Sequence, residues 1–306
     1  MRLRFAWIPL GLVLLAPPPA PVDGTVARKH ILALSQDIGA RVSGAPNEEK
    51  AALYIETAFR EAGYTPVRQR FTFRQRQSSN IIAVKQGSSD RELIVGAHYD
   101  SEQRGSGADD NASGVGVMLE AAAAVRSVST PYTIRFVAFG GEEADLQGSS
   151  YYVREMTPDM RSNTEGMVNI DSVTAGDFAY VYGDEGARGK MRDWVLALAK
   201  KDGLDLGTQS GLNPKFPAGT TGDFSDQAPF RKAGIPYVYF ESTNWTLGKK
   251  DGYTQVDVKL GERGELWHTP FDTIEYIETT FPGRMNQRLK LFSGVLYRLL
   301  TEFTAR

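Results

Sequence analysis

The chain has 306 residues, of which 41% are hydrophobic and 24% are charged, and its formal net charge is −2. This length and composition are typical of a soluble globular protein with one large core. No basic stripe with interleaved aromatic residues stands out, which argues against nucleic acid as a partner. The absence of cysteine excludes disulfides and anchoring through a lipidated cysteine.

The first twenty residues are typical of a secretory signal peptide. Arg2 and Arg4 make the start positive, residues 5–16 form an apolar run, and residues 17–20 are rich in proline and end in a small residue. The apolar run is shorter than the roughly 20 residues that a membrane-spanning helix needs. We therefore expect residues 21–306 to be secreted or periplasmic, with no stable membrane insertion after cleavage. An uncleaved membrane anchor is the alternative.

Hydrophobic periodicity and turn residues predict alternating helices and strands along the rest of the chain. A helix is predicted at 47–63, then strands at 65–73, 80–86 and 92–97, a buried helix at 112–127 and a strand at 133–139. A short helix at 147–156, a strand ending at Asp171, a strand at 178–183, a helix at 187–201, a strand at 235–240 and a terminal helix at 286–304 follow.

This alternation predicts an α/β fold with one catalytic domain over residues 21–306. We expect a mixed, mostly parallel central β-sheet flanked by helices on both faces. The polar stretch at 243–266, rich in Gly and Lys, is expected to be an insertion or a lid near the functional site.

Ionisable residues follow several of the predicted strands, where ligands bind in sheets of this kind. His98 follows an apolar run, the pair Glu142-Glu143 follows the strand at 133–139, and Asp171 ends its own strand. Asp109-Asp110 and a second histidine, His268, add to this set. Imidazole and carboxylate are ligands that zinc prefers. Two histidines and three carboxylate sites, one of them able to bridge, would hold two metal ions, which indicates a hydrolase.

Each of these residues also has a structural interpretation. A lone histidine after a strand is more often structural, and an Asp-Asp-Asn-Ala-Ser-Gly run is usually a loop that caps a helix. The Glu142-Glu143 pair is harder to explain by solvation, because one carboxylate can bind metal while its neighbour serves as general base. Asp100 can accept the second ring N–H of His98 and so fix its tautomer. His30, in the amphipathic run 26–34, is interpreted as structural or surface-exposed.

Several segments, in this order, resemble the co-catalytic di-zinc aminopeptidases of family M28. They are Gly96-Ala97-His98-Tyr99-Asp100-Ser101, Gly107-Ala108-Asp109-Asp110-Asn111-Ala112-Ser113-Gly114, Phe139-Gly140-Gly141-Glu142-Glu143, Asn169-Ile170-Asp171-Ser172, Ser225-Asp226-Gln227-Ala228-Pro229-Phe230 and Trp267-His268-Thr269-Pro270-Phe271-Asp272-Thr273. The resemblance spans about residues 30–300. Within the family, the C-terminal part is most similar to the alkaline-phosphatase isozyme-conversion aminopeptidases, through segments that include Glu241-Ser242-Thr243-Asn244-Trp245 and Lys250-Asp251-Gly252-Tyr253.

The resemblance implies a role for each matching residue. Asp110 would bridge two zinc ions, or two other divalent ions. The peptide bond between Asp110 and Asn111 would be cis. His98 and Asp171 would complete the shell of one ion, and Glu143 and His268 that of the other. Glu142 would be the free general base.

The implied activity is removal of the N-terminal residue from a peptide or protein with a free N-terminus. The isozyme-conversion relatives remove N-terminal arginine, which calls for an acidic pocket. Asp223, Asp226, Asp184 and Glu241 are the candidates to line it. Trp267, also a candidate substrate contact, stands where some family members have Tyr, so it offers only an indole N–H to an oxyanion.

Two other functions fit parts of the same pattern. Glutaminyl cyclase, a zinc acyltransferase on the same fold, shares the His-Tyr-Asp-Ser segment, the Glu-Glu pair and the Trp-His-Thr segment. It typically lacks the pattern that this chain carries at 110–114. A non-catalytic binding protein is the second alternative, although all five ligands and Glu142 are present. The sequence leaves the oligomeric state open.

Overall fold

The computed structural model describes residues 22–257 and 264–305. The signal peptide predicted at 1–20 and the central part of the 243–266 segment, residues 258–263, lie outside the described residues.

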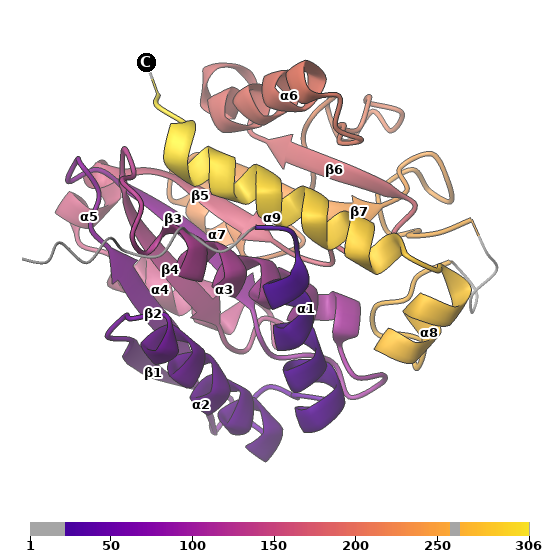
Figure 1. Cartoon of the computed structure of the whole chain (residues 1–306), viewed down its shortest axis with the longest axis horizontal. Helices are drawn as coiled ribbons and strands as arrows, with labels where there is room; N and C mark the ends of the chain where they lie inside the picture. Colours follow the sequence, from indigo (N-terminus) through magenta and orange to yellow (C-terminus); the bar gives the residue numbers. More distant parts are fainter. Residues whose placement is uncertain (1–21, 258–263, 306) are drawn as a thin grey trace, which may run out of the picture.

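The described helices and strands alternate along most of the chain, as Figure 1 shows. The strands are β1 (Val67–Phe73), β2 (Arg76–Lys85), β3 (Glu92–His98), β4 (Thr133–Phe139), β5 (Thr164–Ile170), β6 (Phe178–Gly183) and β7 (Tyr237–Thr243). The α-helices are α1 (Thr25–Ile31), α2 (Pro46–Glu61), α3 (Gly114–Val125), α4 (Gln147–Glu155), α5 (Pro158–Asn163), α6 (Lys190–Asp202), α7 (Gln227–Lys232), α8 (Ile274–Thr280) and α9 (Arg284–Glu302). The other helical segments are η1 (Leu32–Ile38), η2 (Ala108–Ser113) and η3 (Gly186–Gly189).

All seven strands form one sheet in the order β1-β2-β4-β3-β5-β7-β6. The central strands β4, β3, β5 and β7 pair in parallel. The pairings of β1 with β2, β2 with β4 and β6 with β7 are antiparallel. The expected mixed sheet is therefore confirmed, with a parallel centre and antiparallel margins. The parallel centre matters for function, because it brings the carboxyl ends of four strands to one edge.

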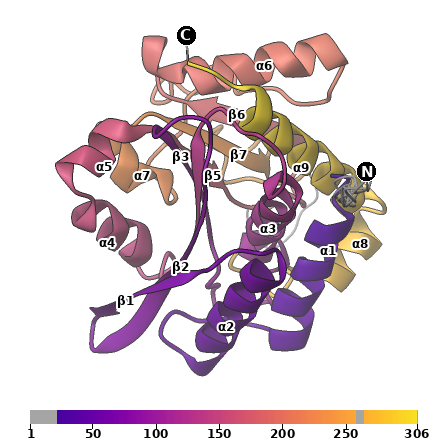
Figure 2. The same cartoon turned by 60° about the vertical axis from the view of Figure 1, so that its left-hand side comes forward.

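Helices cover both faces of the sheet, as the turned view in Figure 2 shows. One face carries α1, α2, α3 and α9, and the other carries α4, α5 and α7. A glycine permits the close contact between α1 and α3, since a Cβ at Gly116 would lie 2.6 Å from the carbonyl oxygen of Ala27. The larger core lies on this face, and a smaller core lies beneath α4 and α7.

The differences from the predicted elements lie in short or kinked segments and at strand boundaries, since β2 begins at Arg76 instead of residue 80 and β7 ends at Thr243 instead of residue 240. The short helices α1, α5, α7 and α8 are absent from the predicted elements, because one or two turns carry too little periodicity to detect. The predicted helix at 112–127 begins as the turn η2, in which Asp110 and Asn111 have non-helical backbone angles, and becomes regular at Gly114. Among the described residues, no helix is both long and apolar enough to cross a bilayer.

Candidate active site

The parallel centre of the sheet brings four of the predicted site residues to one edge. His98 is the last residue of β3, Glu142 and Glu143 follow β4 after two glycines, and Asp171 directly follows β5. Asp110 reaches the same edge from η2. These positions follow from sheet topology, because neighbouring parallel strands end side by side.

Asn111 and Gly114 hold η2 against the end of β5. The Asn111 side chain donates from Nδ2 to the carbonyl oxygen of Ile170 at 2.9 Å, and its Oδ1 accepts from the backbone N–H of Gly114 at 2.8 Å. A Cβ at Gly114 would lie 2.2 Å from the same Ile170 oxygen, so only glycine permits this approach. The Asp110–Asn111 peptide bond is cis, as expected from the resemblance.

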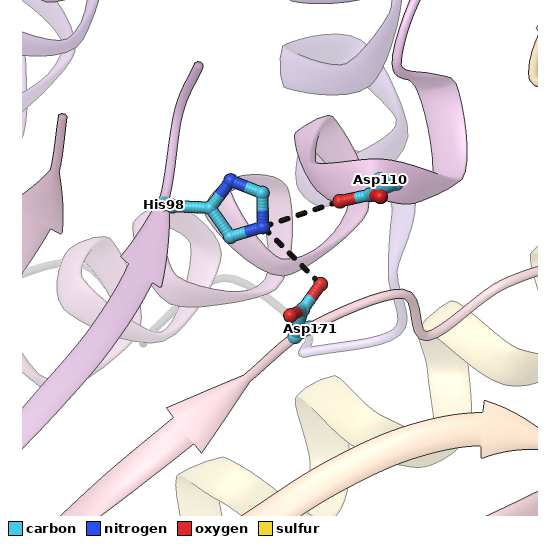
Figure 3. Close-up of side chains that lie close together, drawn as sticks. All are labelled: His98, Asp110 and Asp171. Atoms are coloured by element: carbon cyan, nitrogen blue, oxygen red, sulfur yellow. Dashed lines mark ion pairs between the residues drawn. The ribbon is translucent and has the colours of Figure 1, made fainter. Parts of the chain in front are cut away.

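Asp110 lies between the two histidines and faces each with a different oxygen. Figure 3 shows His98 Nε2 pointing at Asp110 Oδ1, 3.2 Å away, and at Asp171 Oδ1, 3.4 Å away. On the other side, His268 Nε2 lies 3.2 Å from Asp110 Oδ2 and 3.0 Å from Glu143 Oε2. Two trios of donors therefore share Asp110.

The donor set fits metal ions. Within each trio, His98-Asp110-Asp171 and Asp110-Glu143-His268, the donor atoms lie within 4.8 Å of one another. Imidazole and carboxylate together are the usual donors to catalytic zinc. A third group, His98 with Glu142 and Glu143, also meets this spacing. The spacing therefore brings Glu142 to the site but does not distinguish a general base from a metal ligand. Its role as general base stays a prediction.

Buried charge also favours cations here. Burial alone lowers the pKa of a histidine, but the carboxylates of Glu142 and Asp171 raise the pKa of His98 well above its usual value. Hydrogen bonds to Asp110 and Glu143 likewise outweigh burial and raise the pKa of His268 to about 12. Burial raises the pKa of Glu143 to about 7, with a contribution from Asp110. A field that holds protons on imidazole also attracts divalent cations, which would displace those protons.

Asp100 organises the loop that carries the glutamates. Its carboxylate accepts from the backbone N–H of Glu142 at 3.0 Å, from that of Glu143 at 3.1 Å and from the hydroxyl of Ser43 at 2.6 Å. His98 Nδ1 lies 3.6 Å from this carboxylate and 3.2 Å from the main-chain oxygen of Asp100. In this arrangement the nearest acceptor for the second ring N–H of His98 is the Asp100 carbonyl rather than its carboxylate.

A cleft with an empty volume of about 580 Å³ opens above these residues. Beyond the metal-binding candidates, it is lined by Thr221, Phe224, Tyr239, Glu241, Asp251, Tyr253 and Trp267. Among the described residues that line it, none is lysine or arginine. The lining is therefore strongly acidic with an aromatic wall, which suits a ligand that carries positive charge.

Glu241 and Trp267, two of the predicted substrate contacts, both line the cleft, and their contact with substrate stays a prediction. Glu241, at the end of β7, is 9% exposed, and its carboxylate accepts from the hydroxyls of Tyr182 at 2.7 Å and Tyr239 at 3.3 Å. Burial raises the pKa of Glu241 to about 8. Trp267 packs edge-on against Tyr253.

The other three acidic candidates have different surroundings. Asp223 forms a two-pronged ion pair with Arg231, at 2.8 and 2.7 Å, and is absent from the cleft lining. Asp184 pairs with Arg188 and borders a separate surface hollow. Asp226 is completely buried, with both carboxylate oxygens unpartnered among the described residues. Of the four acidic candidates, only Glu241 lines the cleft among the described residues.

Several residues that shape the site have no role predicted from the sequence. Tyr239 shares a strand face with Glu241, which the period-two alternation of β7 predicts once the strand is known. Asp251 and Tyr253 stand in a segment quoted only for its resemblance. Arg41 is fully buried and donates to the main-chain oxygens of Tyr99 and Gly107, among others, fixing the loop between His98 and Asp110.

Comparisons with known proteins show which family the chain is similar to. A family model described as peptidase family M28 matches residues 80–292. The alkaline phosphatase isozyme conversion protein of Escherichia coli K12 is 32% identical, over 99% of this chain and 97% of its own length. Aminopeptidase YwaD of Bacillus subtilis is 33% identical over 74% of this chain, which spans only 45% of that relative's length.

Two solved structures share the architecture. A zinc aminopeptidase from Bacillus subtilis has a TM-score of 0.74 at 21% identity, covering 93% of this chain and 97% of its own. A glutaminyl cyclase from Porphyromonas gingivalis has a TM-score of 0.65 at 20% identity, covering 91% and 96%. At these identities the two structures establish the fold, and they leave the choice of reaction to the site itself.

Proposed function

The chain belongs to peptidase family M28 and is a metallo-aminopeptidase, and from that premise we propose that it uses two zinc ions, prefers basic N-terminal residues and is exported. The observation that carries the two-ion site is the position of Asp110, whose two oxygens face two separate trios of donors. His98, Asp110 and Asp171 would hold one ion, and Asp110, Glu143 and His268 the other.

Bound there, the ions would supply Lewis-acid polarisation of the scissile carbonyl and activation of a water molecule. Glu142, whose carboxylate lies 3.9 Å from His98 Nε2, would take the proton of the attacking water and return it to the leaving amine. The acidic lining of the cleft supports recognition of a free α-ammonium group. Such recognition would confine cleavage to the N-terminal residue of a peptide or protein.

Glu241 supports a preference for a basic side chain. Its carboxylate is buried at the cleft and, among the described residues, bonds to the hydroxyls of Tyr182 and Tyr239 rather than to a lysine or arginine. Tyr239, Tyr253 and Trp267 line the same cleft. A guanidinium group would gain charge-assisted hydrogen bonds from Glu241 and stacking contacts from the aromatic residues of the cleft. An uncharged side chain would gain neither.

Export is proposed from the N-terminal sequence alone. The positive start at Arg2 and Arg4 and the short apolar run after it support cleavage and release to the periplasm or the medium. Mass spectrometry of the mature N-terminus, recovered from each cell fraction, tests this. A mature protein that retains residues 1–20 in the membrane fraction would establish an uncleaved anchor instead.

The two alternatives lead to different chemistry. Glutaminyl cyclase has the same fold, but this chain retains the pattern from Asp110 to Gly114 that binds η2 to β5, which supports the peptidase. A non-catalytic binding protein would not need Glu142 beside two complete donor trios.

A peptide panel separates these possibilities. Zinc-loaded protein would be incubated with peptides that begin with Arg, Leu, Gln and acetylated Leu, and the products followed by mass spectrometry. Loss of one residue from free N-termini only, fastest for Arg and abolished by a chelator, is the expected result. Loss of ammonia from the Gln peptide alone would instead identify a cyclase, and four unchanged peptides would favour a binding protein.

A further inference from the structure

Two buried side chains beneath the cleft, Asp109 and Gln255, connect three segments of the chain that carry metal-ligand candidates. Each is 0% exposed, and neither lines the cleft. Asp109 directly precedes Asp110, whereas Gln255 lies in the described part of the 243–266 segment. Their hydrogen bonds connect η2, the chain after β5 and the loop that carries His268.

Asp109 connects η2 to the segment that follows Asp171. Its Oδ1 accepts from the backbone N–H and the hydroxyl of Thr174, both at 2.7 Å, and from the N–H of Ala175 at 3.1 Å. Its Oδ2 accepts from Nε2 of Gln255 at 2.8 Å. All four donors converge on one buried carboxylate, so the spacing between Asp110 and Asp171 depends on it.

Gln255 extends the connection to the third segment. Its Oε1 accepts from the backbone N–H of Leu266 at 2.6 Å and from that of Trp267 at 3.0 Å, immediately before His268. Asp272, just beyond His268, accepts from the N–H groups of Asp109 at 2.6 Å and Asp110 at 3.1 Å. The chain around His268 is thus attached to η2 on both sides.

His268 needs such an attachment more than the other candidate ligands do. His98 ends a strand and Asp171 directly follows one, so the sheet fixes both of them. His268 lies on a loop, its side chain is 54% exposed, and its backbone adopts a φ of 59°. Sheet hydrogen bonds therefore do not set the position of its imidazole relative to Asp110 and Glu143.

We propose that the Asp109–Gln255 pair is the positioning element that holds His268 in register with Asp110 and Glu143, and so sets the affinity for the second metal ion. This inference rests on the proposed two-ion site. The pair works because a glutamine amide offers a donor to Asp109 and an acceptor to the two N–H groups. Neither a carboxylate nor an apolar side chain at position 255 supplies both.

Reversing the donor and acceptor tests the pair. Gln255→Glu sets two carboxylates against each other, and Asp109→Asn sets an amide N–H₂ against other donors. The double variant Asp109→Asn/Gln255→Glu restores one donor facing one acceptor, and the remaining oxygens still accept from Thr174 and Trp267. Zinc binding to the metal-free protein would be measured by competition with a chelator, which resolves two binding steps.

Each single variant is expected to weaken one of the two binding steps by about 10- to 100-fold, with a smaller effect on the other. The double variant should recover most of that loss. Gln209→Glu is the matched control, because Gln209 is also buried, at 2% exposed, but among the described residues its side chain bonds only to the main chain of residues 211–220. The variant Gln209→Glu should lower the melting temperature of the chelated protein and leave both zinc affinities unchanged.

Three results would overturn the proposal: normal zinc affinities in Gln255→Glu, no recovery in the double variant, or equal zinc loss in the Gln209 control. If Gln255→Glu fails to fold, Gln255→Met compared with Gln209→Met asks the same question without an added charge. A wild-type protein that binds fewer than two zinc ions would overturn the proposed two-ion site instead, so the two failures are distinguishable.

Discussion

Gly114 lies directly against the end of β5, where a Cβ atom would come within 2.2 Å of the carbonyl oxygen of Ile170. This contact fixes the distance between the helix that follows Asp110 and the strand that precedes Asp171. The need for glycine at position 114 is therefore a condition for bringing Asp110 and Asp171 together around His98.

Gly114→Ala should therefore damage both stability and the site. The new methyl group meets rigid backbone, so α3 must move away from β5, at a cost of about 1–3 kcal/mol or more. Gly294→Ala is the control, because nothing lies within 4 Å of a Cβ at that position in α9. It should be neutral or stabilising by about 0.5–1 kcal/mol. Urea denaturation and zinc content of both variants check this, and equal behaviour of the two would contradict it.

Glu142→Gln should lower turnover by about 10²- to 10⁴-fold, because a neutral amide cannot take a proton from water. Its zinc content should stay near that of the wild type, since the two trios remain complete. Steady-state hydrolysis of an Arg-led peptide and metal analysis measure the two effects. Glu155→Gln, at the exposed end of α4, is the control. Near-normal turnover in Glu142→Gln would refute its role as base.

Glu241→Gln should reduce the ratio of kcat/KM for Arg-led over Leu-led peptides by about 10- to 100-fold, the value of a lost hydrogen bond to a charged group. Asp223→Asn should leave this ratio unchanged, because Asp223 pairs with Arg231 outside the cleft. Paired kinetics on the two peptides supply the ratio. If Asp223→Asn abolished the preference and Glu241→Gln did not, the pocket would be assigned to the wrong acid.

Zinc binding should release protons. In the metal-free protein the pKa of His98 is raised well above its usual value and that of His268 to about 12, so both imidazoles are protonated near pH 7. A metal ion must displace these protons, and its apparent affinity should rise by about tenfold per pH unit for each one displaced. Calorimetric titration in buffers of different ionisation enthalpy counts the protons. Binding with no proton release would contradict the prediction.

His30 should make stability depend on pH. Burial, with a contribution from Lys29, lowers its pKa to about 4, and its ring contacts the Tyr54 hydroxyl at 2.8 Å. The unfolded chain binds a proton below about pH 6.5, before the folded protein does. Stability should therefore fall as the pH falls from about 6.5 to 4, by up to about 1.4 kcal/mol per unit.

The variant His30→Gln should lose this part of the dependence. Urea denaturation of both chelated proteins at pH 7 and pH 5 isolates the histidine, because the other groups titrate alike in each. An equal loss of stability in the two proteins over this range would show that His30 does not contribute.

The sequence by itself determined the parallel centre of the fold and the residue types at its edge. Apolar runs ending in His98, Glu142 and Asp171 predict neighbouring strand ends, because parallel strands terminate on the same side of a sheet. The resemblance added the expected pairing of these residues around Asp110. In the structure each histidine faces a different oxygen of Asp110, and the roles of these residues as metal ligands stay predictions. The predicted signal peptide at 1–20 and residues 258–263 of the predicted lid or insertion at 243–266 lie outside the described residues, and both stay predictions.

Only the tertiary structure decided which polar residues from distant parts of the sequence lie at the cleft or hydrogen-bond to the loops around it. Four acids were equal candidates for a substrate pocket, and folding placed Glu241 at the cleft while it paired Asp223 with Arg231. Asp109 and Asp272 stand in segments that carry the resemblance, but no sequence pattern links either of them to the other or to Gln255. Their roles arise from contacts between loops, and loop geometry is set by packing and hydrogen bonds formed across the whole fold rather than by local periodicity.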